Sequence, residues 1–368
     1  MISVFGSDVG EAELDALAGC LDRQWLGMGA ETRRFESRFR DRLGLPNFLM
    51  VDSGSNALYL AVSLLDLPAG SEVILPTFTW VSCAQAVLLA GCRPVFADVD
   101  PATQNVTADT IQPRITPDTS AVMVVHYAGK PVDLDPIVAL GLPVIEDAAH
   151  AVDSRLGDRA CGGIGDVGIY SFDAVKNLTA GAGGGLTVRD PARFERARRL
   201  RYCGIGQSSF DAVSSGAGTG RWWEYDIAEA FIRMTPSDLN AAIANRQLER
   251  LETLQARRAD IWRRYQAAFD EVEAVVTPRD PGPGERHSWF TYFVQLPERD
   301  RIARELLAAD IYTTLRFHPL HLNPIYGPSP ALRHAERLNE TGLNLPLHPR
   351  LSDTEVERVI DEVRNALP

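Results

Sequence analysis

The sequence predicts an α/β protein with a large domain at residues 1–240 and a smaller α+β domain at residues 241–368. Between about residues 45 and 190, short β-rich runs alternate with helical patterns, which indicates a mainly parallel sheet covered by helices. With 368 residues, 45% of them hydrophobic, the chain can bury a large core and form two domains. A long helical pattern then leads from the first region into the second.

Seven strands are predicted in the large domain, each a short apolar run bounded by turn-forming residues. They are Phe48–Val51, Val73–Leu75, Pro94–Ala97, Ala121–Val125, Pro143–Glu146, Val167–Ser171 and Gly185–Val188. Apolar residues at helical spacing predict helices at Asn56–Leu65 and Val81–Ala90. The sheet is therefore expected to lie between layers of helices.

The C-terminal part begins with a helix that Ser237 is expected to cap and that runs to about Phe269. Beyond it, the pattern predicts strands at Thr291–Leu296 and Ile311–Arg316 and helices at Arg299–Ala309 and Ser352–Leu367. Before the long helix, the Ser- and Gly-rich segment Gln207–Gly220 predicts a mobile loop.

The composition excludes several classes of function. A net charge of −12, a pI near 5.1 and the lack of a Lys/Arg-rich run argue against non-specific nucleic-acid binding. The segment Met1–Glu11 has neither the basic nor the apolar region of a signal peptide, and the longest apolar stretches are too short to span a membrane. Five cysteines without a CxxC motif indicate thiols in a reducing compartment. The sequence therefore predicts a cytoplasmic protein.

Charged residues follow two of the predicted strands, where open α/β sheets bind their ligands. Asp147 ends one apolar run, and Lys176 follows another, which ends at Ser171. These are the groups that pyridoxal phosphate needs. The lysine forms a Schiff base, the acid keeps the pyridinium nitrogen protonated, and the hydroxyl binds a phosphate oxygen.

Each of these residues also has a structural interpretation. Lys176 alone could be a solvated lysine, and Asp147 could cap a helix at Ala148–Val152. Because side chains alternate along a strand, only one of Glu146 and Asp147 should point into the site. His150 would lie on the same face of the expected helix and could contact the hydroxyl of the cofactor ring, although a lone histidine is more often structural.

A phosphate site is expected where the first strand leads into a helix. Gly54 and Ser55 would present backbone N–H groups and a hydroxyl to an anion there, although the same residues suit an ordinary helix start. Trp80, at a second strand end, could stack on the cofactor ring or lie in the core. Asp98 and Asp100 have no further acids near them in sequence, and no metal site is predicted.

Together these motifs resemble the DegT/StrS-type sugar-nucleotide aminotransferases, a branch of the fold-type I pyridoxal-phosphate enzymes. The resemblance covers nearly the whole chain. It rests on Trp25–Gly29, Ser53–Leu58, Pro76–Trp80, Glu146–His150, Ser171–Asn177, Asp238–Ala242 and Leu343–His348.

The resemblance implies a homodimer with shared active sites, L-glutamate as amino donor and a nucleoside-diphosphate keto-sugar as acceptor. It implies that Lys176 is the Schiff-base lysine and catalytic acid/base. The residues that it implies for cofactor binding are Gly54, Ser55, Trp80, Asp147, His150, Ser171 and Lys176. We expect a 4-keto-6-deoxy sugar to be aminated at carbon 4, with amination at carbon 3 as the alternative.

Two arginines depart from the family pattern. Arg233 stands where relatives commonly offer an Asn or Lys of the neighbouring subunit to the phosphate, and a guanidinium could replace that contact. Arg316 stands where relatives often carry His and could bind the substrate diphosphate or the carboxylate of glutamate. His321, which follows Arg316 in the same segment of the sequence, is also predicted to bind substrate.

The sequence argues against two other functions. In the dehydratase branch of the family a His replaces the catalytic lysine, so the presence of Lys176 argues against that reaction. A pyridoxal-binding regulatory protein is the second alternative, and the lack of a basic DNA-reading element argues against it.

Overall fold

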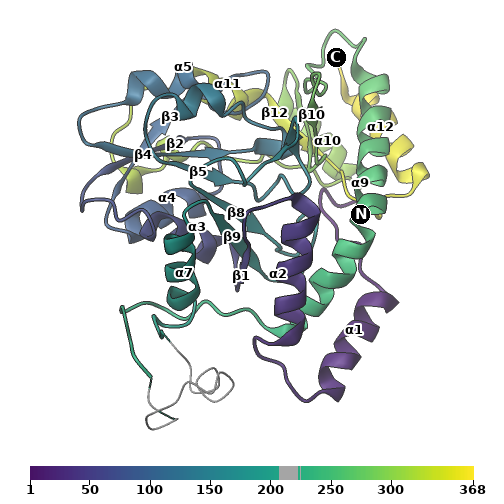
Figure 1. The fold of residues 1–368 in the computed structure, drawn as a ribbon. Helices are drawn as coiled ribbons and strands as arrows, with labels where there is room; N and C mark the ends of the chain where they lie inside the picture. The colour runs from purple at the N-terminus through teal and green to yellow at the C-terminus, as the bar shows by residue number, and fades with distance from the viewer. Residues whose placement is uncertain (207–222, 224) are drawn as a thin grey trace.

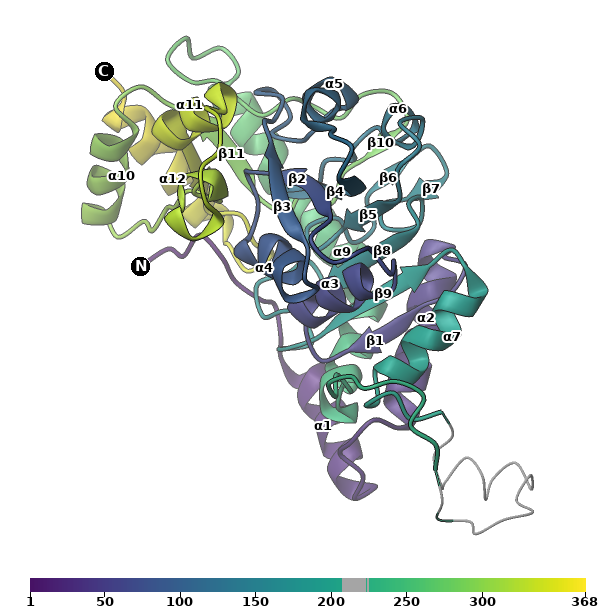
Figure 2. The same ribbon diagram turned by 90° about the vertical axis from the view of Figure 1, so that its left-hand side faces the viewer.

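The computed structural model describes residues 1–206, 223 and 225–368 (Figures 1 and 2). The predicted loop Gln207–Gly220 lies outside these residues. A seven-stranded sheet forms the centre of the fold, in the order β1-β9-β8-β5-β4-β2-β3. Its strands are β1 Leu49–Val51, β2 Glu72–Pro76, β3 Arg93–Ala97, β4 Thr119–Val125, β5 Val144–Asp147, β8 Val167–Ser171 and β9 Gly184–Val188. All seven predicted strands are confirmed.

The sheet is mainly parallel. The strands from β8 to β3 run parallel to one another, whereas β9 pairs antiparallel with both β8 and β1. Strands β1, β2, β5, β8 and β9 are buried along their whole length, as expected of a sheet covered on both faces. Parallel strands β5 and β8 therefore bring their carboxyl ends, which carry Asp147 and Ser171, to the same edge.

Helices cover both faces of the sheet (Figure 1). The helices of the large domain are α1 Glu11–Asp22, α2 Ala30–Leu43, α3 Gly54–Ser63, α4 Val81–Leu89, α5 Ala108–Ile111, α6 Asp135–Val138 and α7 Pro191–Leu200. Ile169 of β8 packs in the same core as α3, and the next residue, Tyr170, packs in the core that α2 lines on the opposite face. The helix expected at Ala148–Val152 was wrong, because the chain makes hydrogen-bonded turns there and passes on to a short strand at Arg155–Leu156.

The C-terminal part has its own small sheet. Strands β11 Tyr292–Gln295 and β12 Gly342–Leu345 pair antiparallel, and β10 Glu285–Arg286 joins β6 Arg155–Leu156 and β7 Arg159–Ala160 in another sheet. The helices here are α10 Arg299–Ala308, α11 Arg333–Thr341 and α12 Asp353–Ala366. The strand predicted at Ile311–Arg316 was wrong. The segment makes only isolated bridges, from Ile311 to Ile2 and from Thr314 to Asn344, so no ladder forms.

Helix α9, Asp238–Phe269, connects the two parts (Figure 2). Ser237 caps it as predicted, its side chain accepting the N–H of Asn240. The first half of α9 packs with α2 in one apolar core, and the second half, including Trp262, packs in a separate core with α12. The division of domains at residue 240 stays a prediction. Among the described residues, no helix combines the length and apolar character needed to cross a membrane.

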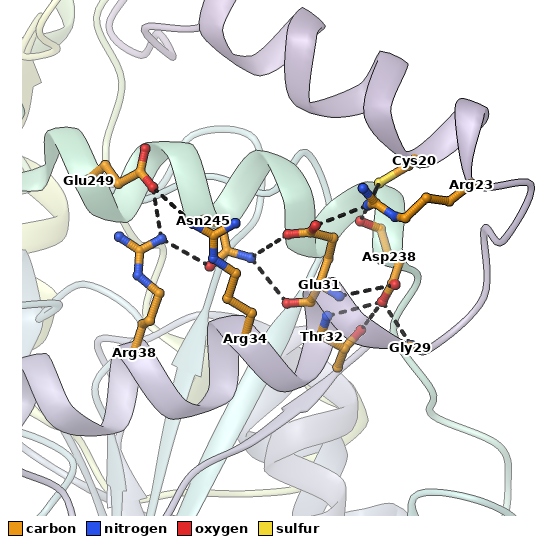
Figure 3. A network of polar contacts seen from close by, with 10 residues as sticks. All are labelled: Cys20, Arg23, Gly29, Glu31, Thr32, Arg34, Arg38, Asp238, Asn245 and Glu249. Carbon is orange, nitrogen blue, oxygen red and sulfur yellow. Dashed lines mark hydrogen bonds and ion pairs between the residues drawn. The ribbon is translucent and has the colours of Figure 1, made fainter.

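A polar network fixes the N-terminal helices to the start of α9 (Figure 3). The carboxylate of Asp238 accepts the backbone N–H groups of Gly29, Glu31 and Thr32 at 2.8, 3.1 and 3.0 Å. These are the free N–H groups at the beginning of α2, so Asp238 acts as a cap supplied by another helix. Two residues further along, the Asn240 amide donates to the carbonyl of Ala180, in the loop that follows Lys176. The start of α9 thus orders both α2 and the lysine loop.

Candidate active site

A cavity of about 440 Å³ opens at the carboxyl end of β8 and the beginning of α3. This is the sheet edge at which α/β proteins bind ligands. Six of the predicted site residues line it: Gly54, Ser55, Trp80, Ser171, Lys176 and Arg316. The cavity therefore unites groups from the central sheet with a group from the C-terminal part.

Lys176 lies in the tight loop after β8, where its backbone N–H donates to the carbonyl of Asp173. Its amine stands 5.0 Å from the centroid of the Phe290 ring. Burial and the positive charge of Arg316 lower the pKa of Lys176 to about 8, although Asp147 and Asp173 oppose the shift. More of the amine is therefore neutral near pH 7 than in a free lysine, as a nucleophile or a base requires.

The two acids at the end of β5 point in opposite directions, as predicted. Asp147 accepts the N–H of Ala149 at 2.9 Å with one oxygen and the thiol of Cys83 at 3.2 Å with the other. Glu146 instead lies 3.0 Å from the ring of His126 and accepts the N–H of Gly162 at 2.7 Å. Glu146 thus holds the fold beneath the sheet edge, and Asp147 is the acid on the side of Lys176, whose pKa it helps to raise.

His150 is buried next to the cavity and stacks on Phe290, with 4.0 Å between ring centroids and 16° between planes. Burial, Lys176 and Arg316 hold the pKa of His150 well below its usual value, so the ring is neutral at pH 7. Its Nδ1 atom is buried and has no hydrogen-bond partner in the part of the chain that the structure describes. A buried polar atom without a partner is costly unless a bound group supplies one.

The beginning of α3 has the form of an anion cradle. Ser53 caps the helix by accepting the N–H of Asn56, and the N–H groups of Gly54 and Ser55 belong to the first turn, which lacks intrahelical partners. A Cβ atom on Gly54 would lie 2.9 Å from the Cβ of Ser171, so only glycine lets that hydroxyl approach the helix. The Ser55 hydroxyl lies 2.7 Å from that of Ser82.

The first two residues of β9, both glycines, permit a second close approach. A Cβ atom on Gly184 would overlap the backbone of Ser53, and one on Gly185 would overlap the ring of Phe48. Glycine at these positions lets β9 lie directly against β1 and the start of α3. The anion cradle and the lysine loop are therefore held together by backbone packing.

Arg316 enters the cavity from the C-terminal part. Its guanidinium carbon lies 3.6 Å from the ring centroid of Phe5 and 5.1 Å from that of Phe290. Its backbone N–H donates to the side chain of Asn344 at 2.7 Å. Burial lowers the pKa of Arg316 to about 10, so it stays charged at neutral pH. Trp80 is exposed where it lines the cavity, and its stacking on a ligand ring stays a prediction.

Four predicted residues do not line the cavity: Asp147 and His150 lie beside it, and Arg233 and His321 make other contacts. Arg233 is exposed, donates to the hydroxyl of Thr235 at 2.8 Å and has its guanidinium carbon 5.9 Å from the ring centroid of Tyr202. His321 is buried, with its two ring nitrogens 2.7 Å from Thr77 and 3.1 Å from Glu336. The proposed contacts of Arg233 and His321 with ligands stay predictions.

Three residues near the reacting groups were not predicted from the sequence: Phe5, Cys83 and Phe290. Cys83 comes three residues after Trp80 on α4, so helical spacing could have placed it on the same face. Phe5 and Phe290 are single aromatic residues without a local pattern, and nothing in their segments signals a site.

The two acids considered for a metal have structural contacts. Asp98 accepts the backbone N–H groups of His334 and Ala335 at the start of α11, at 3.0 and 2.9 Å. Asp100 closes its own turn by accepting the N–H of Thr103. Within the described ranges, no group of three His, Cys, Asp or Glu residues is arranged to hold a metal ion.

The residues in and beside the cavity fit pyridoxal phosphate. Lys176 offers an amine of lowered pKa, Asp147 a buried carboxylate for the ring nitrogen, and α3 an N-terminus with Ser171 for the phosphate. The unpartnered nitrogen of His150 suits the ring hydroxyl of such a cofactor.

Comparison with known proteins gives matches over almost the whole chain. Residues 7–364 match the model of the DegT/DnrJ/EryC1/StrS aminotransferase family. A 4-aminotransferase of dTDP-4-dehydro-2,3,6-trideoxy-D-glucose from Saccharopolyspora spinosa is 40% identical over 376 residues, covering 100% of this chain and 97% of that protein. The spore coat polysaccharide biosynthesis protein SpsC of Bacillus subtilis (strain 168) is 35% identical over 373 residues, covering 97% and 95%.

Solved structures have the same fold. The aminotransferase TlmJ from Streptoalloteichus hindustanus superposes with a TM-score of 0.94 at 41% identity, covering 100% of this chain and 98% of that chain. The PLP form of Spr1654 from Streptococcus pneumoniae gives a TM-score of 0.90 at 26% identity, covering 99% of each chain. The fold-type I architecture predicted from the sequence is confirmed. The chain belongs to the DegT/DnrJ/EryC1/StrS aminotransferase family and is a pyridoxal-phosphate-dependent aminotransferase.

Proposed function

We propose that the protein transfers the amino group of L-glutamate to carbon 4 of a nucleoside-diphosphate 4-keto-6-deoxy sugar, releasing 2-oxoglutarate and the amino sugar nucleotide. The observation that carries the proposal is the joint position of Lys176 and Arg316, whose cationic groups lie 5.0 and 5.1 Å from the centroid of one ring, Phe290. A proton-transfer group and an anion-binding group thus stand within the reach of one small substrate. The 40% identity to a sugar-nucleotide 4-aminotransferase supports carbon 4.

Lys176 is the group that moves the proton. The bound cofactor supplies an electron sink for the substrate carbon that loses its proton. The amine of Lys176 takes that proton from the donor and, in the second half-reaction, delivers a proton to the former keto carbon of the sugar. A pKa lowered to about 8 suits both directions, because neither the protonated nor the free amine is rare near neutral pH.

Arg316 binds a carboxylate of the donor. It makes no ion pair with any acid of the described chain, and its N–H groups are therefore available to a ligand anion. A guanidinium binds a carboxylate through two parallel hydrogen bonds, which also fixes the orientation of the amino acid. Both Arg316 and Lys176 lie against the Phe290 ring, 5.1 and 5.0 Å from its centroid. This placement favours the amino acid over the diphosphate as the partner of Arg316, because a sugar ring separates the diphosphate from the reacting carbon.

Two copies of the chain form the active enzyme in this proposal, and Arg233 of each reaches the cofactor phosphate of the other. Three apolar residues near Arg233 are exposed, namely Tyr225, Ile227 and Ile232, with exposed fractions of 57%, 65% and 52%. Such a surface supports a face that the second copy of the chain covers. Sedimentation of the purified protein should give the mass of a dimer, and a monomer that is fully active would contradict this part. A cytoplasmic location stays a prediction.

Two assays test the reaction. Glutamate added without acceptor should change the visible spectrum of the cofactor-loaded enzyme and release one 2-oxoglutarate per site. If neither occurs, glutamate is not the donor. Thymidine-, uridine- and guanosine-diphosphate keto-sugars with the ketone at carbon 4 or carbon 3 should then be compared by kcat/KM. A preference for the 3-keto series would contradict amination at carbon 4.

A further inference from the structure

Residues 2–8 form an extended segment, here called the N-terminal strap, that begins against the C-terminal part of the protein. The N–H of Ile2 donates to the carbonyl of Asp310 at 2.7 Å, and the carbonyl of Ile2 accepts the N–H of Tyr312 at 2.9 Å. Ile2 and Val4 are buried, whereas Ser3 is exposed, as in an extended chain with one face on the core. Figure 2 shows the strap, in purple, leaving the C-terminal part and running toward α1.

The far end of the strap is attached to the lysine loop and to α9. Gly6 passes so close to His348 that a Cβ atom would lie 2.8 Å from the ring nitrogen. The hydroxyl of Ser7 donates to the carbonyl of Ala174, two residues before Lys176. Asp8 then pairs with Arg250 of α9. Because contacts fix the strap at both ends, the position of the residue between them is determined.

That residue is Phe5, which lines the cavity. The guanidinium carbon of Arg316 lies 3.6 Å from the centre of its ring, the shortest cation–ring distance among the described residues. An aromatic face attracts a guanidinium without occupying its N–H donors, whereas a carboxylate would consume them. A ring therefore suits an arginine that must be held in place and still bind an anion.

We propose that Phe5 is a positioning residue that fixes the guanidinium of Arg316 in the cavity and thereby sets the affinity of the enzyme for its amino donor. The proposal rests on the role given above to Arg316. The strap connects this contact to the lysine loop through Ser7, so the donor site and the proton-transfer group have a fixed relative position.

Glutarate, a dicarboxylate that lacks an amino group, probes this site without turnover. Its binding to the cofactor-loaded enzyme is measured by calorimetry in the wild type, Phe5→Leu, Phe5→Tyr and Phe194→Leu. Phe194 lies on α7 and does not line the cavity, so it controls for the loss of a ring elsewhere. Phe5→Leu should raise the Kd of glutarate and the KM of glutamate about fivefold, with kcat nearly unchanged. Phe5→Tyr keeps the ring face and should restore both values, and Phe194→Leu should alter neither.

Arg316→Gln, alone and combined with Phe5→Leu, shows whether Phe5 acts through Arg316 in binding glutarate. Arg316→Gln should weaken glutarate binding strongly, and adding Phe5→Leu to it should have no further effect. If Arg316→Gln weakens binding and Phe5→Leu does not, the role of Phe5 is overturned and that of Arg316 stands. If the two effects add, Phe5 does not act through Arg316 and the proposal fails. If neither variant changes glutarate binding, Arg316 is not the donor site, and both proposals are overturned.

Discussion

The cavity has two walls that are built in different ways. The sheet wall carries Ser171 and Lys176 at the end of β8 and Gly54 at the start of α3, and backbone hydrogen bonds and glycine contacts hold it. The opposite wall carries Phe5 and Arg316, which come from segments far apart in the sequence and meet through ring contacts. The first wall suits cofactor chemistry, which tolerates little movement. The second suits substrate selection, because a few side chains can change without disturbing the sheet.

The largest effect is expected from the sheet wall. Lys176→Ala should lower kcat by at least about 10³-fold, because it removes the group that transfers the proton. Lys176→Arg is the matched control, since arginine keeps the positive charge but does not release a proton near neutral pH. Both variants should be inactive in steady-state assays with glutamate and keto-sugar while unfolding near the wild-type temperature. Activity of either within tenfold of wild type would refute the role of Lys176.

Beneath the sheet wall, a smaller but still large effect is expected on stability. Glu146→Gln should lower the free energy of unfolding by about 3–5 kcal/mol, because it leaves the buried His126 without its charged partner. Urea denaturation measures this, with Glu357→Gln as the control, since Glu357 pairs with Arg264 on the surface. If the two variants lose similar stability, the buried pair does not support the sheet edge.

The same pair should make stability depend on pH. Burial alone would lower the pKa of His126, but contacts with Cys161 and Glu146 raise it to about 10, from an ordinary value of 6.5. Burial likewise favours the neutral form of Glu146, yet His126 and backbone N–H groups lower its pKa below 4.5. The contribution of His126 is complete below pH 6.5 and is lost as the pH rises through 10, whereas that of Glu146 is lost as the pH falls below 4.5.

Denaturation curves at several pH values check this dependence. The stability difference between the wild type and Glu146→Gln should be greatest between about pH 4.5 and 6.5 and should shrink toward pH 10. A difference that stays constant over this range would show that the pair is not charged in the folded protein.

The sheet wall could be predicted from the sequence, for physical reasons. Strands buried on both faces appear as continuous apolar runs, and charged residues at their ends, such as Asp147 and Lys176, stand out against them. The strand predicted at Ile311–Arg316 does not form. The β-branched residues of this segment favour a strand, but it pairs with its neighbours at single residues only. In the second wall, Arg316 was predicted only through the family resemblance, and Phe5 gave no local signal. The contact of Phe5 with Arg316 depends on the path of the strap, which only the folded chain reveals.

Cys83 offers the smallest and sharpest test of the sheet wall. Its thiol, buried on α4, donates to the second oxygen of Asp147 and lies 3.2 Å from the hydroxyl of Thr79, so it fixes the orientation of the carboxylate. Cys83→Ala should weaken pyridoxal-phosphate binding by about 1 kcal/mol, roughly fivefold in Kd, because one hydrogen bond from a weak thiol donor is lost. Cys83→Ser keeps a donor and should bind the cofactor nearly as the wild type does.

Cys92→Ala is the control. It removes another buried thiol, 3.9 Å from the carbonyl of Ala90 and outside the cavity lining, and should have no effect on the Kd. Equilibrium dialysis of the cofactor separates these cases. If Cys83→Ala and Cys83→Ser weaken cofactor binding equally, Cys83 supports Asp147 by packing and not by its hydrogen bond.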